Sequence, residues 1–332
     1  MRAVNGAAGT SIDTGLVLPA RGRMRRQRIE DVLFRGTTHA LALGVLILLA
    51  AVLVALFIGA LPAIERFGIG YLWGQSWNPV KQLFGALPAI YGTVMTSFIA
   101  LLLAVPVGLG IAMFLTELCP PWLRRPIGVL TELLAAIPSI IYGIWGLFAL
   151  APVLQLTVQP ALMTIFGHLP LLGLLFAGPP LGLGVLTAGF ILAVMVLPFV
   201  ASVSRDVFLT VPAVLRESAY GMGATTSEVV RDIVLPYTRV GVVGGIMLAL
   251  GRALGETMAV TFVIGNAHSI RASLLAPGTT ISATLANEFT EAVDNIYTAS
   301  LIELGLILFV ITFIVLAAAK LMLMRLEERA AK

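Results

Sequence analysis

Two charged residues, Arg252 and Glu256, stand four positions apart inside a long apolar stretch of the chain. On a helix this spacing places both side chains on one face and within pairing distance. A charge at the centre of a bilayer costs about 2.5–3.5 kcal/mol on insertion scales, so the pair indicates a role if the stretch crosses a membrane. In one interpretation the two charges neutralise each other and fix helix packing. In the other, Arg252 offers a permanently charged, fork-shaped set of donors to a tetrahedral oxyanion, and Glu256 holds the arginine when no anion is present.

The other chemistry-bearing residues do not form an enzymatic or metal-binding constellation. The single cysteine, Cys119, excludes a disulfide framework and a cysteine-rich metal site. The three histidines have no metal-ligand spacing. No G-x-x-x-x-G-K-[ST] sequence occurs, so the chain lacks the phosphate-cradling loop needed to hydrolyse ATP. We therefore predict a chain that is not an enzyme, binds no metal and takes any energy for transport from another subunit.

The composition indicates an integral membrane protein. Of the 332 residues, 59% are hydrophobic and 11% are charged, whereas soluble proteins carry about 25% charged residues. So few charges exclude a soluble globule, a disordered chain and a nucleic-acid-binding protein. A spanning helix needs about 20 mostly apolar residues. Six segments meet this requirement and predict an all-α bundle of six transmembrane helices: 40–61, 89–115, 127–151, 184–204, 238–264 and 300–324.

The distribution of Lys and Arg predicts the orientation of the bundle. With both termini cytoplasmic, 17 of the 21 basic residues lie inside, 3 lie outside, and Arg252 lies within a span. The positive-inside rule therefore favours cytoplasmic termini. We expect a cytoplasmic tail at 1–38, a transmembrane domain at 39–325 and a cytoplasmic tail at 326–332. Segment 152–183 is apolar but contains five prolines, which disfavour a long helix. A seventh span there would place the termini on opposite sides and conflict with the charge distribution, so we expect an external loop packed against the bundle, either wholly external or partly re-entrant.

Acidic residues outside the fifth span give weaker indications of a functional role. Glu132 and Glu303 lie near helix ends, where they can reach an interface, pair locally or take part in transport. Four others face the outside in this topology, where they are solvated in loops or contact a soluble protein: Glu65, Glu288, Glu291 and Asp294.

The segment between the fourth and fifth spans, 213–236, has the signals of a helix, a turn and a second helix. Gly223 suits the left-handed position that ends a helix, and Thr225 and Glu228 have the spacing of a capping box. Pro236 is expected to close this element before the fifth span. The pattern predicts a rigid knob on the cytoplasmic side. An amphipathic hairpin lying on the membrane surface is the alternative.

Part of this segment resembles the EAA motif of ABC-importer permeases. Glu217-Ser218-Ala219, Gly223 and Ile233-x-Leu235-Pro236 match the family pattern E-A-A-x3-G-x9-I-x-L-P at every spacing, with Ser218 in place of the second alanine. In that family the loop docks into a groove on the ATP-hydrolysing subunit. The resemblance implies an ATPase-coupling role for six residues: Glu217, Ala219, Gly223, Ile233, Leu235 and Pro236.

Three further stretches are similar to the PstC-type permeases of phosphate ABC importers. They are Gly251 to Val260 (GRALGETMAV), Ser202 to Asp206 (SVSRD) and Pro138 to Gly143 (PSIIYG). The resemblance implies half of a phosphate pathway in a bacterial inner membrane, with Arg252 and Glu256 on that pathway.

It also implies a set of partners: a second, PstA-like permease, two PstB-like ATPase subunits that use ATP and Mg, and an extracytoplasmic PstS-like phosphate-binding protein. No cofactor is expected on this chain itself. The alternatives are a PstA-type or other oxyanion permease and, outside this class, a proton-coupled anion carrier in which Arg252, Glu256 and Glu132 form a relay.

Overall fold

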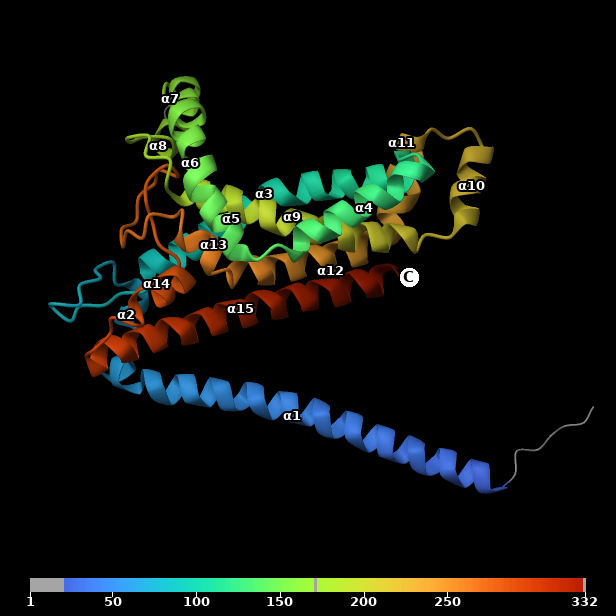
Figure 1. Cartoon of the computed structure of the whole chain (residues 1–332), viewed down its shortest axis with the longest axis horizontal. Coiled ribbons are helices and arrows are strands. Elements are labelled where there is room, and N and C mark those ends of the chain that lie inside the picture. The colour runs from blue at the N-terminus through green and yellow to red at the C-terminus, as the bar shows by residue number, and fades with distance from the viewer. Residues whose placement is uncertain (1–20, 170–171, 331–332) are drawn as a thin grey trace, which may run out of the picture. The chain divides into compact units, whose positions relative to one another are not determined.

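The computed structural model describes the backbone of residues 21–169 and 172–330, and this part of the chain is helical without a strand (Figure 1). The chain divides into two compact units, Met1–Ala55 and Leu56–Lys332. The first unit contains the beginning of α1 (Arg21–Phe67), a single long helix whose described side chains are exposed there. The expected tail at 1–38 is therefore helical from Arg21. Its first 20 residues, and the last two of the expected tail at 326–332, lie outside the described part.

Long helices run side by side through the second unit (Figure 1). They are α3 (Leu87–Met113), α4 (Pro121–Ala136), α9 (Val185–Leu209), α12 (Leu235–Leu254) and α15 (Asn295–Ala330). α9 lies in the middle of this bundle, and its apolar residues Ile191, Leu192 and Val196 are fully buried. A close contact between α3 and the loop before α14 (Ile281–Glu288) depends on Gly92, where a Cβ would lie 1.8 Å from the carbonyl oxygen of Thr279. These contacts make the second unit one packed body.

Six helical segments of the described chain are long and apolar enough to cross a membrane. The prediction of an all-α membrane protein with six spans is therefore confirmed. The first, second, fourth and sixth expected spans lie almost entirely within candidate spans, which belong to α1, α3, α9 and α15. The third and the fifth differ from the expectation.

The third expected span, 127–151, is interrupted. α4 ends at Ala136, Ile137 has an extended backbone (φ −66°, ψ 129°), and α5 (Ser139–Trp145) begins after Pro138. The residue before a proline is pushed out of the helical region, which explains the break. Beyond it the chain turns away from the bundle and stays helical to Phe166 (Figure 1), so the candidate span is Ser139–Phe166. The expected loop at 152–183 is thus partly wrong, since its first part is helical.

A π-helical turn precedes each of two prolines that were expected to end this helix. The turns η2 (Gly146–Leu150) and η3 (Leu154–Val158) are followed by α6 (Ala151–Val153) and α7 (Gln159–Phe166). Pro152 and Pro160 each stand in the first turn of the next α-helical piece. A proline ring clashes with the carbonyl four residues earlier, and here that carbonyl lies within the wider π turn. The helix therefore continues. A further short helix, α8 (Leu172–Leu175), follows.

The fifth expected span, 238–264, is also broken. α12 ends at Leu254, and a short helix, α13 (Met258–Thr261), follows after Gly255, Glu256 and Thr257. Gly255 is the C-cap residue, and glycine is the least favourable ordinary residue for continuing a helix. The charged pair of the fifth span therefore lies at a helix end and not in the middle of a continuous helix.

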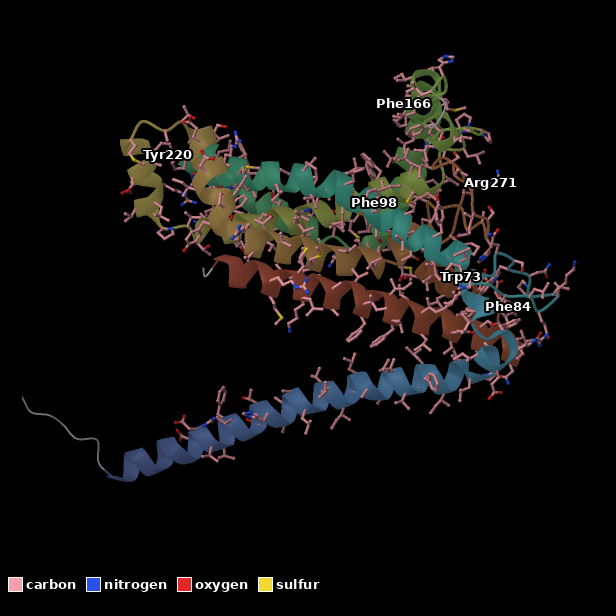
Figure 2. The ribbon with its side chains drawn as sticks, turned by 180° about the vertical axis from the view of Figure 1, so that it is seen from behind. Trp73, Phe84, Phe98, Phe166, Tyr220 and Arg271 are labelled. Atoms are coloured by element: carbon pink, nitrogen blue, oxygen red, sulfur yellow. The ribbon has the colours of Figure 1, made fainter. Side chains whose placement is uncertain are left out.

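The loops of the second unit gather at its two ends. Tyr220, in the segment between α9 and α12, lies at one end of the bundle, and Trp73 in α2 (Gly70–Trp73) and Arg271 lie at the other (Figure 2). The structure thus separates the segment 213–236 from the loops that the charge distribution assigns to the outside. Which end faces the cytoplasm stays a prediction from the basic residues.

Candidate functional site

The segment between α9 and α12 forms the predicted helix and turn. α10 spans Ala213–Gly221, and Gly223 follows with φ of +89°, a conformation in which a side chain is strained. Thr225 then caps α11 (Thr226–Val229). Its Oγ1 accepts the N–H of Glu228 at 3.4 Å, and the Glu228 carboxylate accepts the N–H of Thr225 at 2.7 Å. The predicted glycine terminator and capping box are both confirmed.

Pro236 does not close this element, so that part of the prediction was wrong. α11 passes through a π-helical turn, η4 (Val230–Val234), directly into α12, and Pro236 stands in the first turn of α12. As at Pro152 and Pro160, the carbonyl four residues before the proline belongs to a π turn. The second half of the knob is consequently continuous with the fifth crossing helix.

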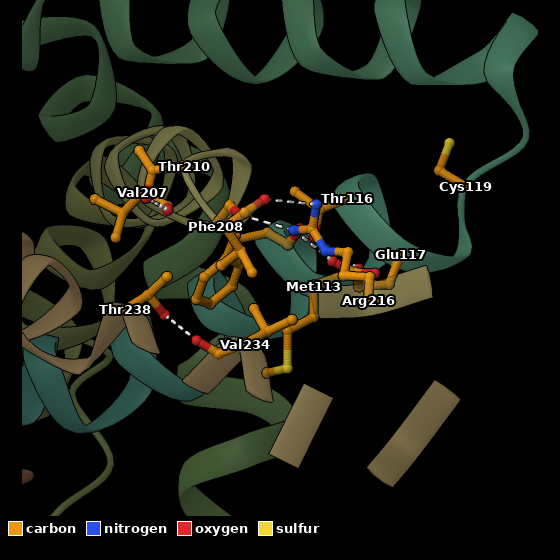
Figure 3. Close-up of polar contacts among 12 residues, drawn as sticks. Met113, Thr116, Glu117, Cys119, Val207, Phe208, Thr210, Arg216, Val234 and Thr238 are labelled. Carbon is orange, nitrogen blue, oxygen red and sulfur yellow. Dashed lines mark hydrogen bonds and ion pairs between the residues drawn. The ribbon is translucent and has the colours of Figure 1, made fainter. Parts of the chain in front are cut away.

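Arg216 fastens α10 to the bundle (Figure 3). Its Nη2 donates to the carbonyl oxygen of Phe208 at 2.7 Å and lies 3.1 Å from Oε1 of Glu117, and its Nη1 donates to the carbonyl oxygen of Val211 at 3.4 Å. Phe208 lies in the last turn of α9, where carbonyls lack partners within the helix. Glu117 comes from the π-helical turn η1 (Phe114–Leu118) after α3, and its side chain is 6% exposed. One guanidinium therefore ties the knob to two helices.

Of the six residues that the resemblance implies in ATPase coupling, some are buried or partly buried and the others are exposed. Ala219 is buried, and Ile233 and Leu235 pack against the same apolar cluster beneath the knob. Several residues are exposed on its outer side: Glu217, Gly223 and Pro236, together with the apolar Val214, Tyr220 and Met222. A rigid underside and an accessible outer face of apolar and acidic groups are suited to docking another protein.

Arg252 and Glu256 do not form the expected pair. Arg252 is exposed in the last turn of α12, and no ion pair joins the two residues in the described part of the chain. Glu256 instead accepts the N–H of Ala259 through Oε1 at 3.2 Å, at the start of α13. The expected pairing assumed a continuous helix, and the break after Leu254 removes the i, i+4 geometry. Arg252 is thereby left with its donors available at the helix end.

Glu132 pairs with a different arginine. Nη2 of Arg205, in α9, lies 2.9 Å from Oε1 of Glu132 in α4, and 2.9 Å from Oδ1 of Asp206. No hydrogen bond or ion pair within the described residues joins Glu132 to Arg252 or Glu256, so the three do not form a connected relay here. Sequence reasoning missed this pair because its members are 73 positions apart.

At the Trp73 end of the bundle, Glu288 joins three segments. Trp77 Nε1 donates to its Oε2 at 2.6 Å, the Tyr297 hydroxyl donates to the same oxygen at 2.7 Å, and His268 Nε2 lies 2.6 Å from Oε1. The Trp77 and His268 rings are stacked, with their centroids 5.1 Å apart. Burial alone would raise the pKa of Glu288, but the hydrogen bonds from His268, Tyr297 and Trp77 outweigh it and the pKa is lowered. Glu288 is thus a structural centre and not a solvated loop residue.

This cluster predicts acid sensitivity. A lowered pKa means that ionised Glu288 stabilises the fold fully above the ordinary carboxyl pKa, about 4.3, and that this contribution is lost as the pH falls through the lowered value. We expect Glu288→Gln to cost about 1–3 kcal/mol of unfolding free energy at pH 7 and clearly less at pH 3. Thermal unfolding in detergent at both pH values measures this. The exposed Glu291→Gln serves as the control and should leave the pH dependence of the unfolding midpoint as in the wild type. If the midpoint of Glu288→Gln falls between pH 7 and pH 3 as steeply as that of the wild type, Glu288 does not have this role.

The amino-acid sequence matches the family described as "Binding-protein-dependent transport system inner membrane component" over residues 104–328, which include the knob and the 252–256 break. The chain belongs to this family. As a member it is a multi-pass membrane permease subunit, a non-catalytic component of an ABC transporter.

Relatives within the family are named phosphate transport system permease protein PstC. That of Mesorhizobium japonicum is 64% identical over 92% of this chain and 94% of its own length, and that of Pasteurella multocida is 56% identical over 91% and 94%. A probable PstC of Methanocaldococcus jannaschii is 40% identical over 82% and 86%. These identities confirm the resemblance of this permease to the PstC type.

Solved transporter structures share the fold of the permease. A bacterial ABC transporter involved in the import of the acidic polysaccharide alginate matches with a TM-score of 0.58 at 17% identity, covering 90% of this chain and 99% of that one. The methionine ABC transporter MetNI, in an inward-facing conformation, matches with a TM-score of 0.53 at 18% identity, covering 76% and 99%. At these identities the likeness shows the fold alone.

Proposed function

We propose that this permease forms one half of the phosphate pathway of an ATP-driven importer in a bacterial inner membrane. The observation that carries the proposal is the 64% identity with a PstC permease over nearly the whole of both chains. The implied partners are a PstA-like second permease, two PstB-like ATPase subunits that use ATP and Mg, and a PstS-like extracytoplasmic binding protein. The excess of basic residues in the segments around the knob supports its assignment to the cytoplasmic side.

In this proposal the knob is the ATPase-docking element. Its outer face presents Glu217 and the apolar Met222, while Arg216 and the buried Ala219 hold its underside to the bundle. Closure of the ATPase subunits would push the knob, and the continuous path from α11 into α12 would carry that movement to the break at 255–257. Arg252 stands at this break with exposed donors suited to a tetrahedral oxyanion. The pathway would thereby alternate its access around Arg252.

The docking step is tested by two charge-changing variants on the outer face of the knob. Glu217→Lys and Met222→Lys alter exposed side chains, so neither should affect folding, and Met222 is 83% exposed. We expect each to reduce ATPase co-purification and phosphate uptake by about tenfold, the effect of a contact in the core of an interface. The matched control is Val293→Lys, a similarly exposed apolar position (94%) at the other end of the bundle.

The outcomes separate the proposal from its rivals. ATPase binding and uptake that match the Val293→Lys control in both knob variants would contradict the docking role. Uptake that persists without any ATPase would favour a proton-coupled carrier. Uptake that prefers sulfate over phosphate in the same vesicles would point to a permease for another oxyanion.

A further inference from the structure

The helical segment that follows α5 runs across the direction of the bundle. α6 and α7, with the π-helical turns η2 and η3 before them, stand out from the side of the second unit (Figure 1). Phe166, the last residue of α7, lies to one side of the bundle, toward the Trp73 end (Figure 2). The long helices α3, α9, α12 and α15 run side by side and set the direction in which the chain crosses a membrane (Figure 1). A helix that runs across them lies close to the membrane plane.

This segment has an apolar exposed side and carries no charge. No Asp, Glu, Lys or Arg occurs between Glu132 and Arg205. The side chains of Phe148, Leu156 and Ile165 are 75%, 76% and 64% exposed. Moving one side chain of this size from water into an apolar phase is worth about 1.5–3 kcal/mol. Water is therefore an unfavourable surrounding for this segment, and its exposed side needs an apolar partner.

The polar side chains of the segment are arranged as in a helix that faces lipid. The exposed hydroxyl of Thr157 donates to the carbonyl oxygen four residues earlier at 2.6 Å, and that of Thr164 donates to the carbonyl oxygen three residues earlier at 2.9 Å. Gln159 is buried, and its Oε1 accepts the N–H of Gly182 at 3.0 Å. Gln155 is exposed, and its uncharged amide can reach the headgroup region from a helix at the membrane interface. Hydroxyls that are satisfied within the helix are what a hydrocarbon surrounding requires.

We propose that the helical run 151–166 lies in the plane of the membrane, in the leaflet at the α2 end of the bundle, with lipid as the partner of its exposed side. α6, η3 and α7 make up this run. Acyl chains cover Leu156 and Ile165, while the side with Gln159 rests on the protein itself. The third crossing is then made by α4 and α5, which both contact α9. The chain keeps six crossings, but only the first part of the candidate span Ser139–Phe166 belongs to one of them.

Lipid fits this side better than a soluble protein partner does. An interface with a soluble protein has a polar rim around its apolar core. The long stretch without a charged residue leaves few groups that could form such a rim. A helix of a second permease is the remaining occupant, and the experiment below distinguishes it from lipid.

Depth measurements with single nitroxide labels test this on the assembled transporter in phospholipid nanodiscs. The labels are attached to Leu156→Cys and Ile165→Cys, and the protein without an added cysteine gives the background, since Cys119 is buried. Collisions with O₂, which concentrates in hydrocarbon, and with a water-soluble nickel chelate report the depth of each label. We expect both labels to collide more with O₂ and their depths to agree within about 5 Å, half the diameter of a helix. A helix that crosses the membrane would separate these positions, nine residues apart, by about 13 Å.

The matched control is an exposed pair at the same spacing on a crossing helix, Phe313→Cys and Met322→Cys in α15, whose depths should differ by about 13 Å. A similar difference between the labels at 156 and 165 would overturn the proposal. Stronger collisions with the nickel chelate would also overturn it, because the segment would then be a loop in water. Few collisions with either reagent would do the same, because protein would then cover the helix. Val153→Cys, at a position that is 53% exposed, replaces either variant if that variant does not assemble.

Discussion

Replacing Arg216 with alanine is expected to lower the unfolding free energy by about 3 kcal/mol, because it leaves the buried Glu117 carboxylate without its counter-charge. The side chain of Glu117 is 6% exposed, so water replaces the lost partner poorly. Arg216 also donates to the carbonyls of Phe208 and Val211, and these acceptors lose their donors in the same variant. The shift of the thermal unfolding midpoint in detergent measures the loss.

Two comparison variants test whether the stability loss comes from the buried pair of Arg216 and Glu117. Arg231→Ala removes an arginine of the same knob that is 86% exposed and whose carboxylate partner is 4.0 Å away, so it should cost less than about 1 kcal/mol. Glu117→Gln combined with Arg216→Met removes both buried charges and should recover part of the stability. A loss in Arg216→Ala no larger than in Arg231→Ala would show that the buried pair does not hold the knob.

Arg252→Gln is expected to reduce phosphate uptake by at least about a hundredfold while the transporter still assembles. Arg252 is exposed and has no ion-pair partner among the described residues, so its removal leaves no buried charge behind. What it removes is the charged donor set that would contact an oxyanion at the helix break. Uptake into vesicles and co-purification of the partner subunits are measured on the same preparation.

The neighbouring charges provide the controls for Arg252. Arg239→Gln changes an exposed arginine near the start of α12 and should leave uptake within about twofold of the wild type. Glu256→Gln should be milder than Arg252→Gln, because a glutamine oxygen can still accept the N–H of Ala259. If Arg252→Gln prevents assembly, the arginine has a packing role and the pathway assignment fails.

The knob shows how far short-range sequence signals reach. The turn at Gly223 and the Thr225–Glu228 capping box each depend on residues within a few positions of one another, and both are present as predicted. The number of spans was also predictable, because it follows from the length of apolar segments. The turn and the capping box are decided by interactions between residues close in the chain, and the number of spans is decided by the composition of the apolar segments.

The prolines and the helix break show where such signals fail. Pro152, Pro160 and Pro236 were expected to end helices, but each follows a π-helical turn, and whether such a turn forms is not encoded by a recognisable residue pattern. Conversely, the apolar run through Gly255 predicted a continuous helix, and the structure ends it there. Hydropathy measures the preference of a segment for lipid, and it does not predict where a π-helical turn forms or where a helix breaks.

Composition, the spacing of apolar segments and local capping residues were sufficient to predict a six-span helical membrane protein with a structured loop between its fourth and fifth spans. Only tertiary packing decided which charges meet. Arg216 reaches Glu117, Arg205 reaches Glu132, and Glu303 reaches no donor among the described residues. These outcomes depend on how helices far apart in the chain approach each other in space. A sequence pattern predicts which residues are neighbours along one helix, but it does not specify how closely two helices approach each other. The distances between helices determine which charged residues of this permease are in contact.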